Sequence, residues 1–326
     1  MNSTNTDKIQ EFTALIVPCY NEECRLDAIQ FMGFLRQNPS YSAIFIDDAS
    51  DDETLDVLES IREAIDCDRV QVLSLPQNVG RAEAIRQGVL LALSPEFQRD
   101  HDIDFIGLLD ASLTTTLSEI RRMVDVAARR DDIDLVIGSR LYLNGHSVHR
   151  NSLRKISSQL LSFATSRMIG LCVCDTRCSV KIFRNGRWLE SVFGAKFSSR
   201  SLFDIEILAR IKKSLGSVAN SKIFEYPLEA WQQPEDSRLK ILDLIKAPWQ
   251  LCRMVLKYRL LPVVVQAAPV DAFESCEVLL GMPDTGKESE NAGVEGLRIF
   301  SPDKSSLSPN KDFRLAKGVT TKRKAA

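Results

Sequence analysis

Short apolar runs alternate with amphipathic segments along the first 140 residues of this chain of 326, and this alternation constrains the fold most strongly. The run Thr13–Val17 reads TALIV, which is typical of a buried strand, whereas residues 22–35 carry apolar side chains at helical spacing. Strands joined by helices through short connections indicate an α/β fold with a mostly parallel sheet and helices on both faces. We predict strands at 13–17, 43–46, 70–75, 104–109 and 135–137, and helices at 22–35, from 53, at 80–93 and at 116–129.

Polar residues follow the predicted strands at the points where the strands end. They lie at Pro18–Asn21, Asp47–Asp48, Asn78–Arg81, Asp110–Ser112 and Gly138–Arg140. Because the carboxyl ends of parallel strands meet at one edge of the sheet, we expect these residues to form a ligand site there. No two glycines lie two residues apart, so the glycine-rich fingerprint of dinucleotide-binding enzymes is absent.

Composition and charge exclude several classes of protein. The 42 Lys and Arg residues against 44 Asp and Glu give a net charge of −2, which argues against a nucleic-acid partner. The polar N-terminus has no apolar core of the kind a signal peptide needs, and no segment offers the roughly 18 uninterrupted apolar residues of a membrane span. We therefore expect a cytoplasmic protein with reduced cysteines.

A set of motifs narrows the interpretation. The sequence reads P-x-Y-N-E-E from Pro18, D-D-x-S-x-D from Asp47, N-x-G-R-A from Asn78 and D-A-S from Asp110. Further along it reads G-S-R at 138–140, D-T-x-C-x-x-K-I-F at 175–183, F-D-I-E-I-L at 203–208 and E-Y-P-L-x-x-W at 225–231. Over residues 12–260 this order resembles family 2 inverting glycosyltransferases, in the dolichyl-phosphate β-glucosyltransferase branch. The resemblance implies a GT-A-type nucleotide-sugar-binding fold and glucose transfer from UDP-glucose to a polyprenyl phosphate.

The resemblance also assigns the donor site. It implies that Asp48 accepts a hydrogen bond from the uracil base and that Arg81 lies near the base and the phosphates. The nucleotide-sugar residues that it implies are Pro18, Tyr20, Asn21, Glu22, Asp48, Asn78, Gly80, Arg81, Asp110 and Ala111.

A divalent metal is the expected cofactor. Family members hold Mg²⁺ or Mn²⁺ with a D-x-D motif, because hard cations prefer oxygen ligands and neutralise the leaving diphosphate. Here the motif is Asp110-Ala111-Ser112, so Asp110 is the expected ligand and Ser112 a weaker second one. The loss of one carboxylate predicts a weakened metal site.

The acceptor phosphate needs cations and orientation, since a phosphate monoester is largely a dianion at neutral pH. Residues 150–187 carry eight Lys or Arg against one Asp, and we expect Arg140, Arg150 and Arg154 to bind this phosphate. By resemblance, Asp175, Asp204 and Glu206 are the catalytic candidates, with Asp175 orienting or activating the acceptor. Trp231, Ser237 and Arg238 resemble an element that closes over the diphosphate.

The chain divides into four expected regions. A flexible N-terminus covers 1–11, the glycosyltransferase domain 12–237, a basic amphipathic helical extension 238–270 and a mostly disordered tail 281–326. Residues 238–259 carry six Lys or Arg against one Asp with apolar residues between them, a pattern typical of a helix at a membrane surface. This favours a peripheral protein on the cytoplasmic face, while the oligomeric state stays open.

Two alternatives remain open at this stage. Ser112, Arg177 and Ser179 depart from the family pattern, so the chain could instead be a weakened or inactive protein that binds a nucleotide sugar or a lipid phosphate on the same fold. A nucleotidyltransferase shares the architecture, but this sequence lacks the glycine-rich, lysine-containing loop after the first strand.

Overall fold

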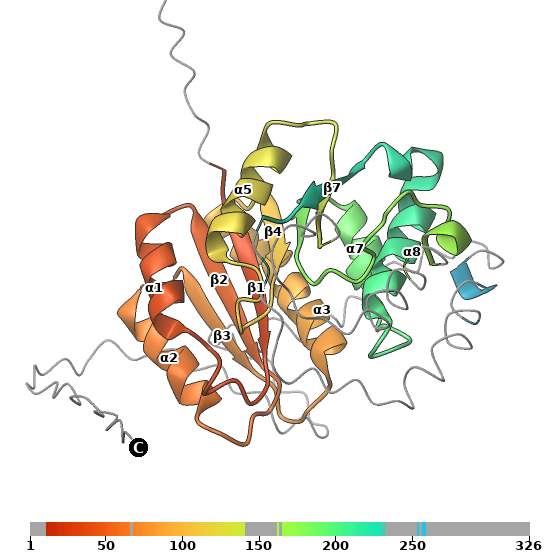
Figure 1. Ribbon diagram of the computed structural model, residues 1–326. Helices are drawn as coiled ribbons and strands as arrows, with labels where there is room; N and C mark the ends of the chain where they lie inside the picture. Colours follow the sequence, from red (N-terminus) through yellow and green to blue (C-terminus); the bar gives the residue numbers. More distant parts are fainter. Residues whose placement is uncertain are drawn as a thin grey trace, which may run out of the picture.

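A computed structural model describes residues 11–65, 68–140, 162, 165–229, 231, 253 and 256–258. Strands and helices alternate from the start of this part of the chain, as the sequence predicts (Figure 1). The elements are β1 Thr13–Cys19, α1 Ala28–Gln37, β2 Tyr41–Asp47, α2 Thr54–Ala64, β3 Val70–Ser74, α3 Arg81–Ala92, α4 Pro95–His101, β4 Phe105–Leu108, α5 Leu117–Ala128, β5 Leu135–Ser139, β6 Lys181–Arg184, α7 Trp188–Phe193, α8 Phe203–Leu215, the 3₁₀ turn η1 Gly216–Asn220 and β7 Ile223–Pro227.

The sheet has seven strands in the order β3-β2-β1-β4-β6-β5-β7. Its first four strands are mutually parallel, and β6 runs antiparallel to both β4 and β5. The predicted α/β class with a mixed, mostly parallel sheet is therefore confirmed. In Figure 1, α1 and α2 lie on one side of β1–β3 and α3 lies on the other. Successive strands are added on one side of β1 up to β3, and β4 is then added on the other side of β1. Because crossovers between parallel strands are right-handed, the connecting helix α3 must lie on the opposite face of the sheet from α1 and α2.

Two differences from the predicted elements have local causes. The first helix begins at Ala28 rather than at residue 22, because Asp27 caps it by accepting from the Gln30 N–H. The preceding residues instead form a loop that contacts the β2–α2 connection, where the Glu22 N–H donates to Thr54 Oγ1 at 2.8 Å. The helix α4 was not predicted, although Ser94 as N-cap before Pro95 is its sequence signal.

The pairing of β4 with β6 brings the segment that contains the catalytic candidate Asp175 close to the carboxyl end of β4. Lys181 at the start of β6 pairs with Leu108 at the end of β4, so the segment before β6 lies beside the residues that follow β4. Within the described residues, every helix is too short or too polar to cross a bilayer.

The core between α3 and the sheet leaves no room for a side chain at Gly88. A methyl group there would lie 2.6 Å from Ile46 Cδ1 and 2.7 Å from Ile16 Cγ2, and both isoleucines are fully buried. The absence of a side chain therefore sets the distance at which α3 packs on β1 and β2.

We expect Gly88→Ala to lower the free energy of unfolding by about 1–3 kcal/mol, because overpacking a closed core costs that much. The control is Gly33→Ala in α1, where nothing lies within 4 Å of the added methyl group. That change should be neutral or stabilise by up to about 1 kcal/mol through helix propensity. Urea unfolding of both variants measures the difference, and equal stabilities would contradict the packing argument.

Candidate functional site

The predicted donor-site residues that the structure describes gather at the carboxyl ends of β1, β2 and β4, together with the start of α3. These ends share one edge because the three strands are parallel neighbours. The other described candidates come from later elements: Arg140 follows β5, Asp175 precedes β6, Asp204 and Glu206 belong to α8, and Trp231 follows β7. Four predicted residues, Arg150, Arg154, Ser237 and Arg238, lie outside the described residues, as does most of the region 238–326.

Asp48 fixes the loop between β3 and α3. Its carboxylate is buried and accepts hydrogen bonds from the backbone N–H groups of Val79 at 2.7 Å and Gly80 at 2.8 Å. Burial raises the pKa of Asp48, and these two hydrogen bonds offset only part of that effect. Gly80 has φ +90°, a conformation that favours glycine, and a methyl group there would lie 3.2 Å from Arg200 Nε. Asp48 thus braces the wall of the expected nucleotide site.

The β1–α1 loop lies against the β2–α2 connection at the same edge of the sheet. Pro18 lies within β1 opposite Ile46 of β2, and Tyr20 leaves 43% of its surface exposed. Asn21 adopts a positive φ of 51°, accepts from the Asp51 N–H through its side chain, and so anchors the loop on the β2–α2 connection. An exposed aromatic ring on an anchored loop is suited to contact a planar base.

Asp110 is held by three side chains. Arg81 forms an ion pair with it, while Ser179 Oγ at 2.6 Å and Thr114 Oγ1 at 2.9 Å donate to its Oδ2 atom. Burial acts to raise the pKa of Asp110, but Arg81 and the Ser179 hydroxyl outweigh it, so the pKa lies below its ordinary value. Asp110 is therefore an anion that already has a cationic partner within the protein.

Asp175 and Arg140 form a two-point ion pair. Arg140 donates from Nε to Oδ2 and from Nη2 to Oδ1 of Asp175, both at 2.7 Å, and the backbone N–H of Arg140 also donates to Oδ2. The Arg140 guanidinium lies 5.5 Å from the ring centroid of Trp231. Burial acts to raise the pKa of Asp175, but Arg140 outweighs it and the pKa is lowered. Arg140, expected from the sequence to face a phosphate, is thus oriented by Asp175.

A third ion pair joins Lys181 and Asp204. Lys181 is completely buried, and its Nζ donates to Asp204 Oδ1 at 2.6 Å. Asp204 also acts electrostatically on Arg81 and Arg140, and Lys181 acts on Asp175. The three pairs therefore form one unit, which we call the ion-pair cluster: Arg81–Asp110, Arg140–Asp175 and Lys181–Asp204.

Glu206 faces a different environment from Asp204, although both lie in the first turns of α8. Its side chain is fully buried and accepts from Tyr258 at 2.5 Å, Arg210 at 2.9 Å, and the Ser198 backbone N–H at 2.8 Å. These contacts join α8 to the segment before it and to Tyr258. The geometry separates Glu206 from the ion-pair cluster.

Several residues of the site carry no strong sequence signal. Ser179, Thr114 and Arg200 are of types common on any surface, and their contacts depend on segments far apart in the chain.

Glu225 belongs to the motif E-Y-P-L, and its carboxylate accepts from the backbone N–H groups of Cys174 and Asp175 at 2.9 and 2.7 Å. It therefore fixes the backbone that carries Asp175.

The residues around Asp110 do not fit a divalent metal well. Mg²⁺ and Mn²⁺ need several oxygen ligands with negative charge, but here a single carboxylate faces a guanidinium and two neutral hydroxyls. Ser112 is half-buried and supplies no charge. Within the described residues, no three His, Cys, Asp or Glu side chains are grouped to hold a metal ion.

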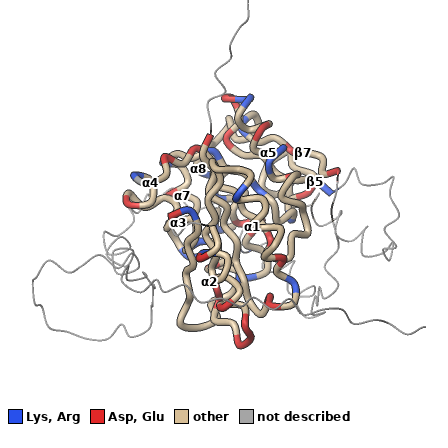
Figure 2. The backbone as a smooth tube through the Cα atoms, turned by 90° about the vertical axis from the view of Figure 1, so that its left-hand side faces the viewer, with Lys and Arg blue, Asp and Glu red and all other residues tan. Residues whose placement is uncertain are grey.

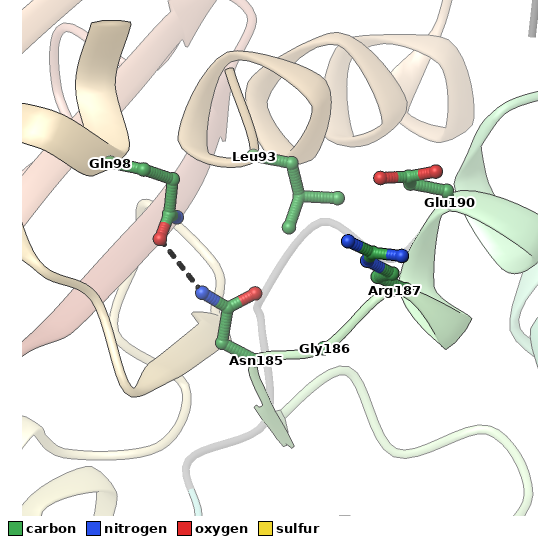
Figure 3. A pocket seen from close by; sticks show the side chains of 6 residues that line it. All are labelled: Leu93, Gln98, Asn185, Gly186, Arg187 and Glu190. Carbon is green, nitrogen blue, oxygen red and sulfur yellow. Dashed lines mark hydrogen bonds between the residues drawn. The ribbon is translucent and has the colours of Figure 1, made fainter. Parts of the chain in front are cut away.

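In the view of Figure 2, acidic and basic residues are interspersed along the backbone of the described chain. A shallow pocket of about 260 Å³ lies away from the cluster, lined by Leu93, Gln98, Asn185, Gly186, Arg187 and Glu190 (Figure 3). Because the Asn185 N–H donates to the Asp104 carbonyl just before β4, this pocket is at the opposite end of β4 from Asp110.

Comparisons with known proteins agree with this fold. Over 260 residues the chain is 26% identical to a dolichyl-phosphate β-glucosyltransferase of Dictyostelium discoideum, covering 76% of this chain and 74% of that protein. It is 25% identical over 265 residues to the Homo sapiens protein of the same name, covering 73% and 77%.

A solved structure with a similar fold is glucosyl-3-phosphoglycerate synthase from Mycobacterium tuberculosis in complex with UDP. Its TM-score is 0.55 at 17% identity, covering 78% of this chain and 82% of that chain. The same enzyme was also solved with Mn²⁺ and UDP-glucose, at a TM-score of 0.51. The likeness confirms the predicted GT-A-type fold.

The model of glycosyl transferase family 2 matches residues 14–193, which is more than half of the chain and runs from the second residue of β1 to the end of α7. The matched segment contains Asp48, Arg81, Asp110, Arg140 and Asp175. The chain belongs to glycosyl transferase family 2 and is a glycosyltransferase.

Proposed function

We propose that this protein transfers glucose from UDP-glucose to a polyprenyl phosphate such as dolichyl phosphate, with inversion at the sugar. The observation that carries the proposal is the similarity to dolichyl-phosphate β-glucosyltransferases, which extends over about three quarters of this chain and of each relative. It extends past β5 to the later motifs, where an acceptor-specific segment would lie.

The donor would lie against the loops that follow β1, β2 and β3. Tyr20 would face the uracil ring, and Asp48, while bracing Val79 and Gly80, would accept from the base through a remaining lone pair. Arg81 would lie next to the diphosphate. The other donor contacts would come from Pro18, Asn21, Glu22, Asn78, Asp110 and Ala111.

The reaction would be a direct displacement. An oxygen of the acceptor phosphate forms a bond to the anomeric carbon while the bond from that carbon to UDP breaks, and the electron pair leaves on the diphosphate. A phosphate dianion needs no base to remove a proton, so the main requirement is orientation and charge. Asp175, whose pKa is lowered, is a weak base and would act by fixing Arg140 toward the acceptor.

The solved relative binds Mn²⁺ with UDP-glucose, and Asp110 with Ser112 is where this chain was expected to hold Mg²⁺ or Mn²⁺. Because the donor set around Asp110 does not fit such an ion, no step of the proposed mechanism depends on one. Asp204 would contribute to the site through Lys181 and its field on Arg81.

Contact with a membrane surface is inferred from the sequence pattern of residues 238–270. The basic amphipathic extension at 238–270 would lie on the cytoplasmic face of a membrane and bring the domain 12–237 to its lipid acceptor. Arg150 and Arg154 would add phosphate contacts, and Trp231, Ser237 and Arg238 would close over the diphosphate. The terminal regions 1–11 and 281–326 have no proposed role in catalysis.

For Glu206 we propose a structural role in place of a catalytic one. Glu206→Gln should lower the free energy of unfolding by roughly 3–5 kcal/mol, because it leaves the buried Arg210 without its charged partner. The rate of transfer per folded molecule should stay within about twofold. Urea unfolding and the folded fraction by circular dichroism, measured beside the rate, check both statements.

The matched control is Glu63→Gln, an exposed glutamate near the end of α2, which should change stability by less than about 0.5 kcal/mol. A Glu206→Gln protein of full stability that transfers glucose a hundredfold more slowly would contradict the structural assignment.

The experiment for the proposed function is a donor panel. The full chain is incubated with dolichyl phosphate in detergent and labelled UDP-glucose or GDP-mannose, and label in the organic phase is counted. The proposal predicts label from UDP-glucose. Label from GDP-mannose alone would reassign the donor, whereas binding of UDP-glucose without any transfer would favour an inactive binding protein.

A further inference from the structure

Arg81 has an unusual combination of contacts for an arginine at a ligand site. It is the first residue of α3, and the positive φ of Gly80 before it turns the chain into the helix at the site edge. One of its amino groups, Nη1, forms the ion pair with Asp110. The other, Nη2, is buried and has no hydrogen-bond acceptor among the described residues.

A buried guanidinium nitrogen without an acceptor is costly, so it marks a place where an anionic ligand atom is expected. Asp110 neutralises Arg81 through one nitrogen and leaves the second free to donate. The second carboxylate of the D-x-D motif is missing, since the position two residues after Asp110 is Ser112. Glu22 and Asp204 act on Arg81 electrostatically, but among the described residues no three such side chains are grouped to hold a metal ion. A divalent ion beside Asp110 would also be repelled by the guanidinium already paired with it.

We propose that the Arg81 guanidinium takes the place of the divalent metal, binding the diphosphate of the donor through Nη2 and neutralising the charge that develops on it. Donor binding and transfer are then independent of divalent metal. This inference rests on the proposed function, because it requires a nucleoside diphosphate at this edge of the sheet. A fixed arginine is a strong donor to phosphate oxygens and suits this task.

Ser179, which departs from the family pattern, contributes to this arrangement. Its hydroxyl donates to Asp110 Oδ2 together with Thr114, so the carboxylate is held in one orientation without a metal. Asp110 then acts as the residue that positions Arg81, and the pair forms a preorganised site for the diphosphate.

The first test uses the full-length wild-type chain. Binding of UDP and of GDP is measured by calorimetry in EDTA and in Mn²⁺, and glucose transfer is measured in the same two buffers. The proposal expects the dissociation constant of UDP and the transfer rate to agree within about threefold between the buffers. Binding or transfer that is lost in EDTA and restored by Mn²⁺ would overturn it.

The outcomes separate this inference from the proposed function. UDP binding that requires Mn²⁺ overturns the role of Arg81 and leaves the glucosyltransferase proposal intact. GDP binding without UDP binding, independent of Mn²⁺, supports Arg81 and overturns the UDP-glucose donor. Binding of neither nucleotide in either buffer overturns both.

Variants provide a second test. Arg81→Gln should weaken UDP binding about 10- to 100-fold in EDTA and should weaken uridine binding by less than about threefold, since uridine has no phosphate. The control is Arg99→Gln, an exposed arginine in α4, which should leave both affinities unchanged. Equal loss of uridine and UDP binding would contradict a diphosphate contact.

In the double variant Arg81→Gln with Ser112→Asp, a Mn²⁺ ion should take over the role of the Arg81 guanidinium. The two substitutions remove the guanidinium and restore the second carboxylate, so UDP binding should become at least about tenfold tighter in Mn²⁺ than in EDTA. A double variant with no response to Mn²⁺, tested with thermal unfolding to confirm that it is folded, would contradict the claim that the guanidinium replaces the ion.

Discussion

Asp175→Asn is expected to lower the rate of glucose transfer by about 10²- to 10³-fold while the affinity for UDP-glucose changes less than about threefold. The substitution preserves the shape of the side chain but removes the charge that holds the Arg140 guanidinium through two hydrogen bonds of 2.7 Å. Arg140 would then lose its orientation toward the acceptor, and precise orientation accounts for rate factors of this size. Steady-state rates and calorimetric binding of the donor separate the two effects.

The matched control is Asp132→Asn. Asp132 is also paired with an arginine, Arg130, but it lies 63% exposed on the surface away from the ion-pair cluster. Its loss should leave transfer and stability nearly unchanged, because exposed ion pairs contribute little. A D175N protein that transfers at the wild-type rate would remove Asp175 from the mechanism. A D175N protein that loses donor binding to the same extent as transfer would place Asp175 in the donor site instead.

Asp48→Ala is expected to weaken UDP binding about 10- to 100-fold. The buried carboxylate accepts from two backbone N–H groups of the β3–α3 loop, and each buried donor left without a partner costs about 1–3 kcal/mol. The loop that precedes Arg81 would shift to reach water, and any contact of Asp48 with the base would be lost as well. Each 1.4 kcal/mol corresponds to a tenfold change in affinity.

The control for Asp48 is Asp51→Ala. Asp51 is an exposed aspartate that lies, like Asp48, in the connection between β2 and α2. This substitution removes the same charge a short distance away and should leave UDP affinity within about twofold. If both variants weaken UDP binding equally, the effect arises from net charge and not from the bracing of the loop. If Asp48→Ala binds UDP as the wild type does, the nucleotide lies elsewhere.

The order of strands and helices could be predicted well because both depend on local patterns. Residues 14–17 and 43–46 are apolar throughout, as strands buried on both faces require, and both runs fall inside observed strands. The polar residues at the predicted strand ends do meet at one edge of the sheet, and their role in binding the donor stays a prediction. The antiparallel strand β6 was not among the predicted strands, because a short run of four residues inside a motif has no periodicity to detect.

The contacts of individual side chains could not be predicted from the sequence. The sequence predicted a phosphate contact for Arg140 but did not predict its ion pair with Asp175. The two residues are 35 positions apart in the chain, and only the fold brings them together. Asp204 and Glu206 are two residues apart in one motif, yet helical geometry directs them to different sides of α8. Their partners, Lys181 and Arg210, decide their environments, and those pairings depend on the packing of α8.

A competition assay distinguishes a lipid phosphate acceptor from a water-soluble phosphate acceptor. The full chain is given labelled UDP-glucose with equal concentrations of dolichyl phosphate in detergent and 3-phosphoglycerate, and the organic and aqueous phases are counted separately. We expect the label transferred by the enzyme to enter the organic phase, as a product whose anomeric configuration is inverted. Label that appears in aqueous glucosyl-phosphoglycerate while the organic phase stays empty would contradict it.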